Sequence, residues 1–373
     1  MKRLRVAVVI PTHFDIYSSL NNLLKVYRYL MKYKGVKVAI FTDKKNNPDY
    51  RDFGIIKING VDYGNIFGKI LFALGMPRFY YTDLIDKLEG YDVIESSNPE
   101  FYGFAYQSYL AAKKYHARLV YRTSQTIEGF YLFRITKYLV VPFVRKAYNY
   151  ASFLLFTNPQ AEERCIRLGL MKNKSKSIVI GHATDTRCFK PMKVKKSKRI
   201  ILLSVGGLYK IKGHHLIIKS LKKIIDRGDD AELWIVGEGY YKSNLNALSK
   251  QLKIENKVKF LGNKSHDELA KIYNSSDVFV LANYQEMTPA VNEAMACGIP
   301  VVAMQCGGDR FVIPSDDFGL ISKKFDAGDM AEKIMMLLDN RGLAEKISIN
   351  GRNHILKNFT IENVAEKIYR SFT

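Results

Sequence analysis

The chain has 373 residues, which is longer than one hydrophobic core usually grows, so two domains of roughly 150 to 200 residues are expected. Its four cysteines show neither CxxC spacing nor nearby histidine pairs, which argues against a zinc site and a disulfide framework. No run of about 18 uncharged apolar residues and no small-residue cleavage site occurs. We therefore expect a cytoplasmic protein without a spanning helix or a signal peptide.

The formal net charge is +22, and most of the excess lies in the first half. Residues 1–190 carry 30 Lys and Arg against 15 Asp and Glu, a balance of +15, whereas residues 191–373 carry 28 against 21, a balance of +7. Such a surface favours phosphates, nucleic acid or anionic lipid, although a lysine-rich surface without a partner is an alternative. The basic residues are spread along the domain and no aromatic RNA-binding motif occurs, so no nucleic-acid partner is expected.

The first half alternates between short β-branched apolar runs and helical stretches. Strands are predicted at 4–10, 36–41, 93–95, 118–122, 152–157 and 178–180. Helices are predicted at 18–33 and 101–115. This alternation predicts a doubly wound α/β domain.

A second alternation follows the charged, proline-led stretch 191–199, which we interpret as a linker. Its strands are predicted at 200–205, 232–236, 258–261, 278–281 and 300–303. Its helices are predicted at 214–227, 241–252, 266–274 and 288–297. The predicted fold is therefore α/β, with Rossmann-like doubly wound domains at 1–190 and 200–357 that face a central cleft, and a helix in 358–373 that crosses back.

The most informative segment is NYQEMTPAVNEAMACGIPVV at residues 283–302. Pro289 suits the first turn of a helix, whose free N–H groups and positive dipole end would face a diphosphate. Glu293 lies about one turn further, where its carboxylate could accept two hydrogen bonds from the cis-diol of a ribose. The alternative is an exposed helix glutamate.

This segment resembles the nucleotide-sugar signature of the family 4 retaining glycosyltransferases, which have the GT-B fold. In that signature, two glutamates eight positions apart flank a loop ahead of EAMACGxPVV, and EAMACGIPVV stands here at 293–302. The likeness continues in GHATDTRCFKP (181–191), VGGLYKIKG (205–213), WIVGEG (234–239), VKFLGNKSHDELAKIYNSSDVFVLA (258–282) and Gly307-Gly308. It covers the second half densely and the first half only through the strand and helix pattern.

The resemblance implies a UDP- or GDP-type nucleotide-sugar donor, a glycan or lipid-linked acceptor, and no cofactor. Lys212 would neutralise the leaving diphosphate and Glu293 would bind the donor ribose, whereas an ordinary surface lysine is the alternative for Lys212. The expected donor-binding residues are Gly206, Gly207, Lys212, Gly237, Glu238, Gln285, Glu286, Met287, Thr288, Pro289, Ala290 and Glu293. The expected catalytic residues are Lys212, Gln285 and His13.

The chain departs from the family pattern at several of these positions. Gln285 stands where the first glutamate is expected, with Glu286 one position late, and Gly207 stands where the family usually has an arginine. PTHFDIYSS replaces the glycine pair after the first strand, and the stretch 121–125 lacks the histidine found near the reaction centre. His13, which could equally be a turn histidine, or Arg122 could compensate.

These departures favour an alternative, a catalytically weakened homologue that binds a nucleotide sugar or a partner. A dinucleotide-dependent dehydrogenase is excluded because no GxGxxG follows the first strand. No DxD pair lies in a suitable loop, so no metal site is expected.

Two segments, 63–81 and 130–150, mix aromatic and basic residues. They predict an interfacial helix that lies on an anionic membrane surface or holds a lipid-linked acceptor, which would make the protein peripheral on the inner face of a membrane. Core helices with basic ends are the alternative.

Overall fold

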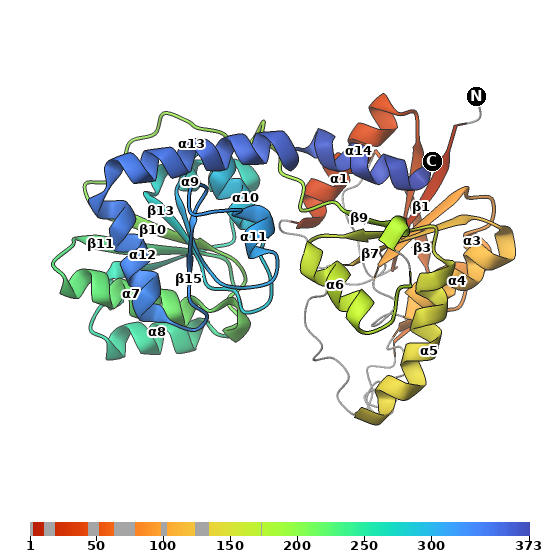
Figure 1. Ribbon diagram of the computed structural model, residues 1–373, viewed down its shortest axis with the longest axis horizontal. Coiled ribbons are helices and arrows are strands. Elements are labelled where there is room, and N and C mark those ends of the chain that lie inside the picture. Colours follow the sequence, from red (N-terminus) through yellow and green to blue (C-terminus); the bar gives the residue numbers. More distant parts are fainter. Residues whose placement is uncertain are drawn as a thin grey trace. The chain divides into compact units, whose positions relative to one another are not determined.

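The computed structural model (Figure 1) describes residues 3–10, 19–43, 52–62, 79–97, 103–123, 134–172 and 174–373. Internal contacts divide it into two compact units. The first unit extends to Gly181 and includes Val364–Thr373, and the second is built mainly from His182–Asn363. None of the helices described in either unit combines the length and the apolar content needed to span a membrane.

The first unit contains a seven-stranded parallel sheet of order β3-β2-β1-β6-β7-β8-β9. Its strands are β1 (Arg5–Val9), β2 (Lys37–Asp43), β3 (Gly54–Ile58), β6 (Val93–Ser97), β7 (Arg118–Thr123), β8 (Phe153–Phe156) and β9 (Ser177–Val179). The doubly wound architecture predicted from the alternation is confirmed. The sequence did not predict β3 or the antiparallel pair β4 (Gly60–Asp62) and β5 (Phe79–Tyr81). The run of β3, GIIKI, contains a glycine and a lysine, residue types that are depleted in strands.

Helices cover the first sheet and anchor the end of the chain. They are α1 (Ser19–Tyr33), α3 (Leu84–Lys87), α4 (Gly103–Tyr115), α5 (Arg134–Tyr150), α6 (Pro159–Arg167) and α14 (Ile361–Phe372). The Lys34 ammonium, just after α1, lies 2.7 Å from a carboxylate oxygen of Glu366 in α14. Val364 and Ile368 of α14 are buried. The C-terminal helix therefore packs on this unit, beside α1 (Figure 1).

The second unit contains a six-stranded parallel sheet of order β12-β11-β10-β13-β14-β15. Its strands are β10 (Ile200–Val205), β11 (Ala231–Val236), β12 (Val258–Gly262), β13 (Val278–Leu281), β14 (Val301–Met304) and β15 (Leu320–Ser322), the last of which the sequence did not predict. The strand order reverses between β10 and β13. In open α/β sheets, ligands bind outside the carboxyl ends of the strands at such a reversal.

Two layers of helices enclose the second sheet (Figure 1). One apolar cluster joins it to α7 (His214–Asp226), α8 (Lys242–Gln251) and α12 (Ala327–Asp339). Another joins it to α9 (His266–Ser275), α10 (Pro289–Ala296) and α11 (Asp309–Val312). The long helix α13 (Arg341–Asn358) packs against α10 and α12. This unit is therefore a three-layer α/β/α sandwich, with loops at the ends of its strands.

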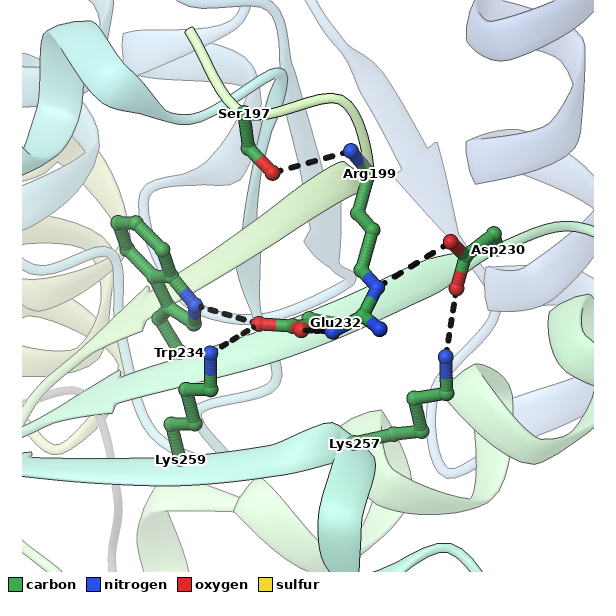
Figure 2. A network of polar contacts seen from close by, with 7 residues as sticks. All are labelled: Ser197, Arg199, Asp230, Glu232, Trp234, Lys257 and Lys259. Carbon is green, nitrogen blue, oxygen red and sulfur yellow. Dashed lines mark hydrogen bonds and ion pairs between the residues drawn. The ribbon is translucent and has the colours of Figure 1, made fainter.

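A charged network lies at the amino ends of β10 and β11 (Figure 2). Glu232 is 2% exposed, and its carboxylate pairs with Arg199 and, at 2.6 Å, with the Lys259 ammonium. The Trp234 indole N–H also donates to this carboxylate, at 3.3 Å. Burial opposes ionisation, but hydrogen bonds from Lys259, Arg199 and Trp234 outweigh it and hold the pKa of Glu232 at about 2.

We expect Glu232→Gln to lower the free energy of unfolding at pH 7 by about 2 kcal/mol. A carboxyl whose folded pKa is depressed contributes stability above its unfolded pKa and loses it as the pH falls toward the folded value. Urea denaturation of both proteins should therefore show a difference that shrinks below about pH 4.5. The exposed Glu255 supplies the control, Glu255→Gln, which should change little. A difference that stays constant with pH would contradict this account.

Candidate functional site

The expected donor-binding residues converge at one edge of the second sheet. Gly206, Gly207 and Lys212 follow β10, Gly237 and Glu238 follow β11, and residues 285–290 follow β13. Because all these strands are parallel, their carboxyl ends meet at the same edge, and β10 and β13 flank the reversal of strand order. The candidate site is therefore the set of loops at this edge.

The loops after β10 and β11 touch backbone to backbone. A Cβ atom added to Gly237 would lie 2.1 Å from the Gly206 carbonyl oxygen, and one added to Gly239 would lie 2.4 Å from that of Leu208. The Leu208 N–H donates to the Glu238 carbonyl at 2.9 Å. Only glycine permits this approach, which explains the glycines of the two motifs. The Glu238 side chain is 45% exposed and forms an ion pair with the Lys242 ammonium.

A third glycine joins the β10 loop to the loop after β13. Gly213 has φ 68°, and a Cβ atom there would lie 2.1 Å from the Ala282 carbonyl oxygen. The Tyr284 N–H donates to the Ile211 carbonyl at 3.0 Å. These contacts hold Lys212, which lies between Ile211 and Gly213, against the loop that carries Gln285 and Glu286.

Lys212 and Glu286 interact electrostatically within this site. Burial lowers the pKa of the Lys212 ammonium, and the attraction of the Glu286 carboxylate raises it by less. Burial raises the pKa of Glu286 to about 7, although the attraction of the Lys212 ammonium lowers it in part. The backbone of Gln285 connects this loop to the residues after β14, because its carbonyl accepts a hydrogen bond from the Gly307 N–H at 2.9 Å. The site thus holds a largely buried ammonium and a buried carboxyl that attract each other.

Glu293 lies in the first turns of α10 and is fully buried, so the alternative of an exposed helix glutamate is wrong. Its carboxylate accepts a hydrogen bond from the Tyr273 hydroxyl at 3.0 Å. Pro289 occupies the start of α10, and the Thr288 N-cap makes no side-chain capping bond. Tyr273 was missed by sequence analysis, since nothing in the spacing of α9 relates it to a residue 20 positions later. The role of Glu293 toward a ribose stays a prediction.

His214, at the start of α7, lies beneath the Gly206-Gly207 turn. Its ring is 2% exposed, and Nδ1 lies 3.2 Å from the Ser204 hydroxyl. Burial lowers the pKa of His214 to about 4, so the imidazole is neutral at physiological pH. The sequence analysis assigned this histidine no role, and the structure places it against the backbone of the turn.

In the first unit, Arg122 is not a free cation. Its guanidinium lies 3.4 Å from a carboxylate oxygen of Glu95, a residue that is 1% exposed. Because this buried carboxylate compensates the charge, the expectation that Arg122 replaces a missing cation loses its support. His13 lies outside the described residues, so its expected catalytic role stays a prediction.

We expect Gly213→Ala to lower the free energy of unfolding by roughly 3 kcal/mol, because the new Cβ atom meets a backbone oxygen that cannot move cheaply. Gly262→Ala is a matched control, since Gly262 has nearly the same φ, 69°, and its Cβ would meet only the flexible end of Glu238, at 3.3 Å. The control should cost about 1 kcal/mol. If denaturant unfolding gave equal losses of unfolding free energy for the two variants, the contact with Ala282 would contribute nothing.

Comparison with solved structures shows the same fold over the whole chain. HepE of Anabaena, solved in complex with UDP and glucose, aligns with a TM-score of 0.80 at 15% identity and covers 99% of both chains. A glycosyltransferase from Rickettsia africae ESF-5 aligns with a TM-score of 0.77 at 19% identity and covers 100% of this chain and 98% of its own. The expected GT-B fold is confirmed.

Sequence comparison finds relatives that match about half of the chain. An uncharacterized glycosyltransferase of Methanocaldococcus jannaschii is 32% identical over 45% of this chain and 43% of its own length. The N-acetyl-alpha-D-glucosaminyl L-malate synthase of Bacillus anthracis is 28% identical over 49% and 47%, respectively. The chain thus spans about half the length of the curated relatives it matches. Residues 186–354, most of the second unit, match the family Glycosyl transferases group 1.

Proposed function

We propose that the protein is a family 4 retaining glycosyltransferase, which transfers a sugar from a UDP- or GDP-type donor to a glycan or lipid-linked acceptor. The observation that carries the proposal is the position of Lys212, held by glycine-only contacts at the strand-order reversal of a unit that matches the group 1 family. The start of α10 adds N–H groups and a positive dipole end at the same edge. The UDP and glucose bound by HepE, which shares the fold, support this donor class.

The chemistry follows from where charge develops. In a front-face displacement, the bond between the anomeric carbon and the diphosphate oxygen breaks while the acceptor oxygen bonds to that carbon from the same side. The acceptor proton passes to the leaving phosphate oxygen. The Lys212 ammonium stabilises the charge that grows on the diphosphate, which is where a fixed cation lowers a barrier most. Gln285 offers a neutral amide to sugar hydroxyls.

A weakened homologue that binds donor or partner is the second candidate. Gln285 in place of a glutamate and Gly207 in place of an arginine favour it, because both remove a charge from the site. The two candidates differ in turnover, not in donor binding. Donor hydrolysis and transfer assays therefore separate them once a donor is known.

An acceptor on a membrane surface stays a prediction. On α5, the described side chains Phe143, Arg145, Lys146 and Tyr150 are exposed, with Phe143 at 57%. This combination of aromatic and basic groups supports the expected contact with an anionic surface.

A thermal-shift screen against UDP, GDP, ADP, CMP and their common sugar conjugates tests the donor. A ligand that binds only the folded state raises the melting temperature by mass action, so one nucleotide class should give a clear rise. Lys212→Met should abolish most of the rise, and Glu293→Gln should weaken it. The exposed Lys210 of the same turn gives the control, Lys210→Met, which should keep it. No rise with any ligand at millimolar concentration would sink the proposal.

Binding of the nucleotide sugar should weaken as the pH rises through about 7. Above its pKa of about 7, Glu286 is ionised and repels a diphosphate, whereas below it the neutral carboxyl does not. A nucleotide sugar is a diphosphate diester that does not itself titrate in this range. We expect calorimetry to give roughly fivefold weaker binding at pH 8 than at pH 6, and no such trend in Glu286→Gln. Glu238→Gln should retain the trend, and a trend that survives Glu286→Gln would assign it elsewhere.

A further inference from the structure

We propose that the Tyr209 hydroxyl donates a hydrogen bond to the donor diphosphate, beside the Lys212 ammonium and across the space that Gly207 leaves open. This inference rests on the proposed function and names a contact in the same site. Tyr209 thereby supplies, as a neutral donor, a second contact to the group that Lys212 binds.

The Tyr209 ring occupies the place of a side chain at position 207. A Cβ atom added to Gly207 would lie 2.5 Å from Cε2 and 2.9 Å from Cδ2 of Tyr209. The Cζ atom, which bears the hydroxyl, lies 3.5 Å from the same point. The absence of a side chain at 207 therefore lets the hydroxyl-bearing edge of the ring lie along the turn after β10.

The Tyr209 ring packs beside a second aromatic ring, on the loop after β11. Its centroid lies 5.4 Å from that of Tyr240, which is 73% exposed. Leu208 precedes Tyr209 and Tyr241 follows Tyr240, and the Tyr241 N–H donates a hydrogen bond to the Leu208 carbonyl at 2.9 Å. The backbones next to the two rings are therefore bonded to each other. A contact that narrows the ring's conformations lowers the entropy that is lost when a ligand binds.

Tyr209 and Lys212 belong to one 3-10 turn. The Lys212 N–H donates to the Tyr209 carbonyl at 2.9 Å, and the short helix between them spans Lys210–Lys212. Tyr209 itself has extended backbone angles (φ -117°, ψ 148°) and stands as the N-cap of this helix, and residues that close such a turn have Cα atoms less than about 7 Å apart. Both side chains thus leave neighbouring points of one tight turn, and a diphosphate has several oxygens with which to meet the ammonium and the phenol.

The hydroxyl is available for that contact. The Tyr209 side chain is partly exposed, and its hydroxyl makes no hydrogen bond to any residue in the part of the chain that the structure describes. A phenol donates well, and a hydrogen bond to an anionic oxygen is stronger than one between neutral groups. Since Glu286 partly offsets the charge of Lys212, a second donor adds stabilisation without adding a second buried charge.

The first test is calorimetry with the nucleoside diphosphate that wild type binds, using Tyr209→Phe and the control Tyr240→Phe. We expect Tyr209→Phe to weaken binding about tenfold and Tyr240→Phe to leave it unchanged. The corresponding nucleoside, which lacks phosphates, should compete equally well in both variants. Equal affinity of wild type and Tyr209→Phe for the diphosphate would overturn the inference.

A position swap supplies the second test. Tyr209→Ala should lose affinity, and Gly207→Arg in that background should restore it, because the removed ring leaves space for a guanidinium beside Lys212. The melting temperature of each variant checks that it folds. Failure of the swap to restore affinity would place the phosphates away from position 207 and contradict the inference. No nucleotide binding by wild type would instead refute the proposed function, which separates the two failures.

Discussion

The candidate site depends on close backbone contact between three loops at the carboxyl ends of parallel strands. Gly237 and Gly239 bring the loop after β11 onto the loop after β10, and Gly213 brings the latter onto Ala282. Each approach is closer than any side chain allows. The groups that carry charge, Lys212 and Glu286, are positioned by these contacts and by the backbone bond between Tyr284 and Ile211.

The electrostatics of the site follow from this close packing. Loops that touch directly exclude water from the groups between them, and burial is the largest cause of the shifted pKa values of Lys212, Glu286 and His214. Lys212 and Glu286 each oppose the effect of burial on the other's pKa, so an ionised Glu286 offsets the Lys212 charge. A neutral donor such as Tyr209 suits this balance better than a second cation would.

The two units use charge differently. In the first unit Arg122 is compensated by Glu95 in the interior, and exposed cations such as Arg145 and Lys146 lie on α5. In the second unit the buried pairing at Glu232 lies at the amino ends of the strands, opposite the candidate site along the sheet. Charge therefore stabilises one end of this sheet, while the loops at the other end are available to a ligand.

The sequence by itself determined the doubly wound fold, because long apolar runs alternate with amphipathic stretches, and it placed the motifs at strand ends. It missed β3, whose run GIIKI contains a glycine and a lysine, and β15, which has only three residues ahead of a charged stretch. Only the tertiary structure decided that Glu293 is buried under Tyr273, that Arg122 is compensated by Glu95, and that the Tyr209 ring fills the space at Gly207. These contacts join different elements, or depend on the rotamer of one ring, and residue spacing along the chain encodes neither.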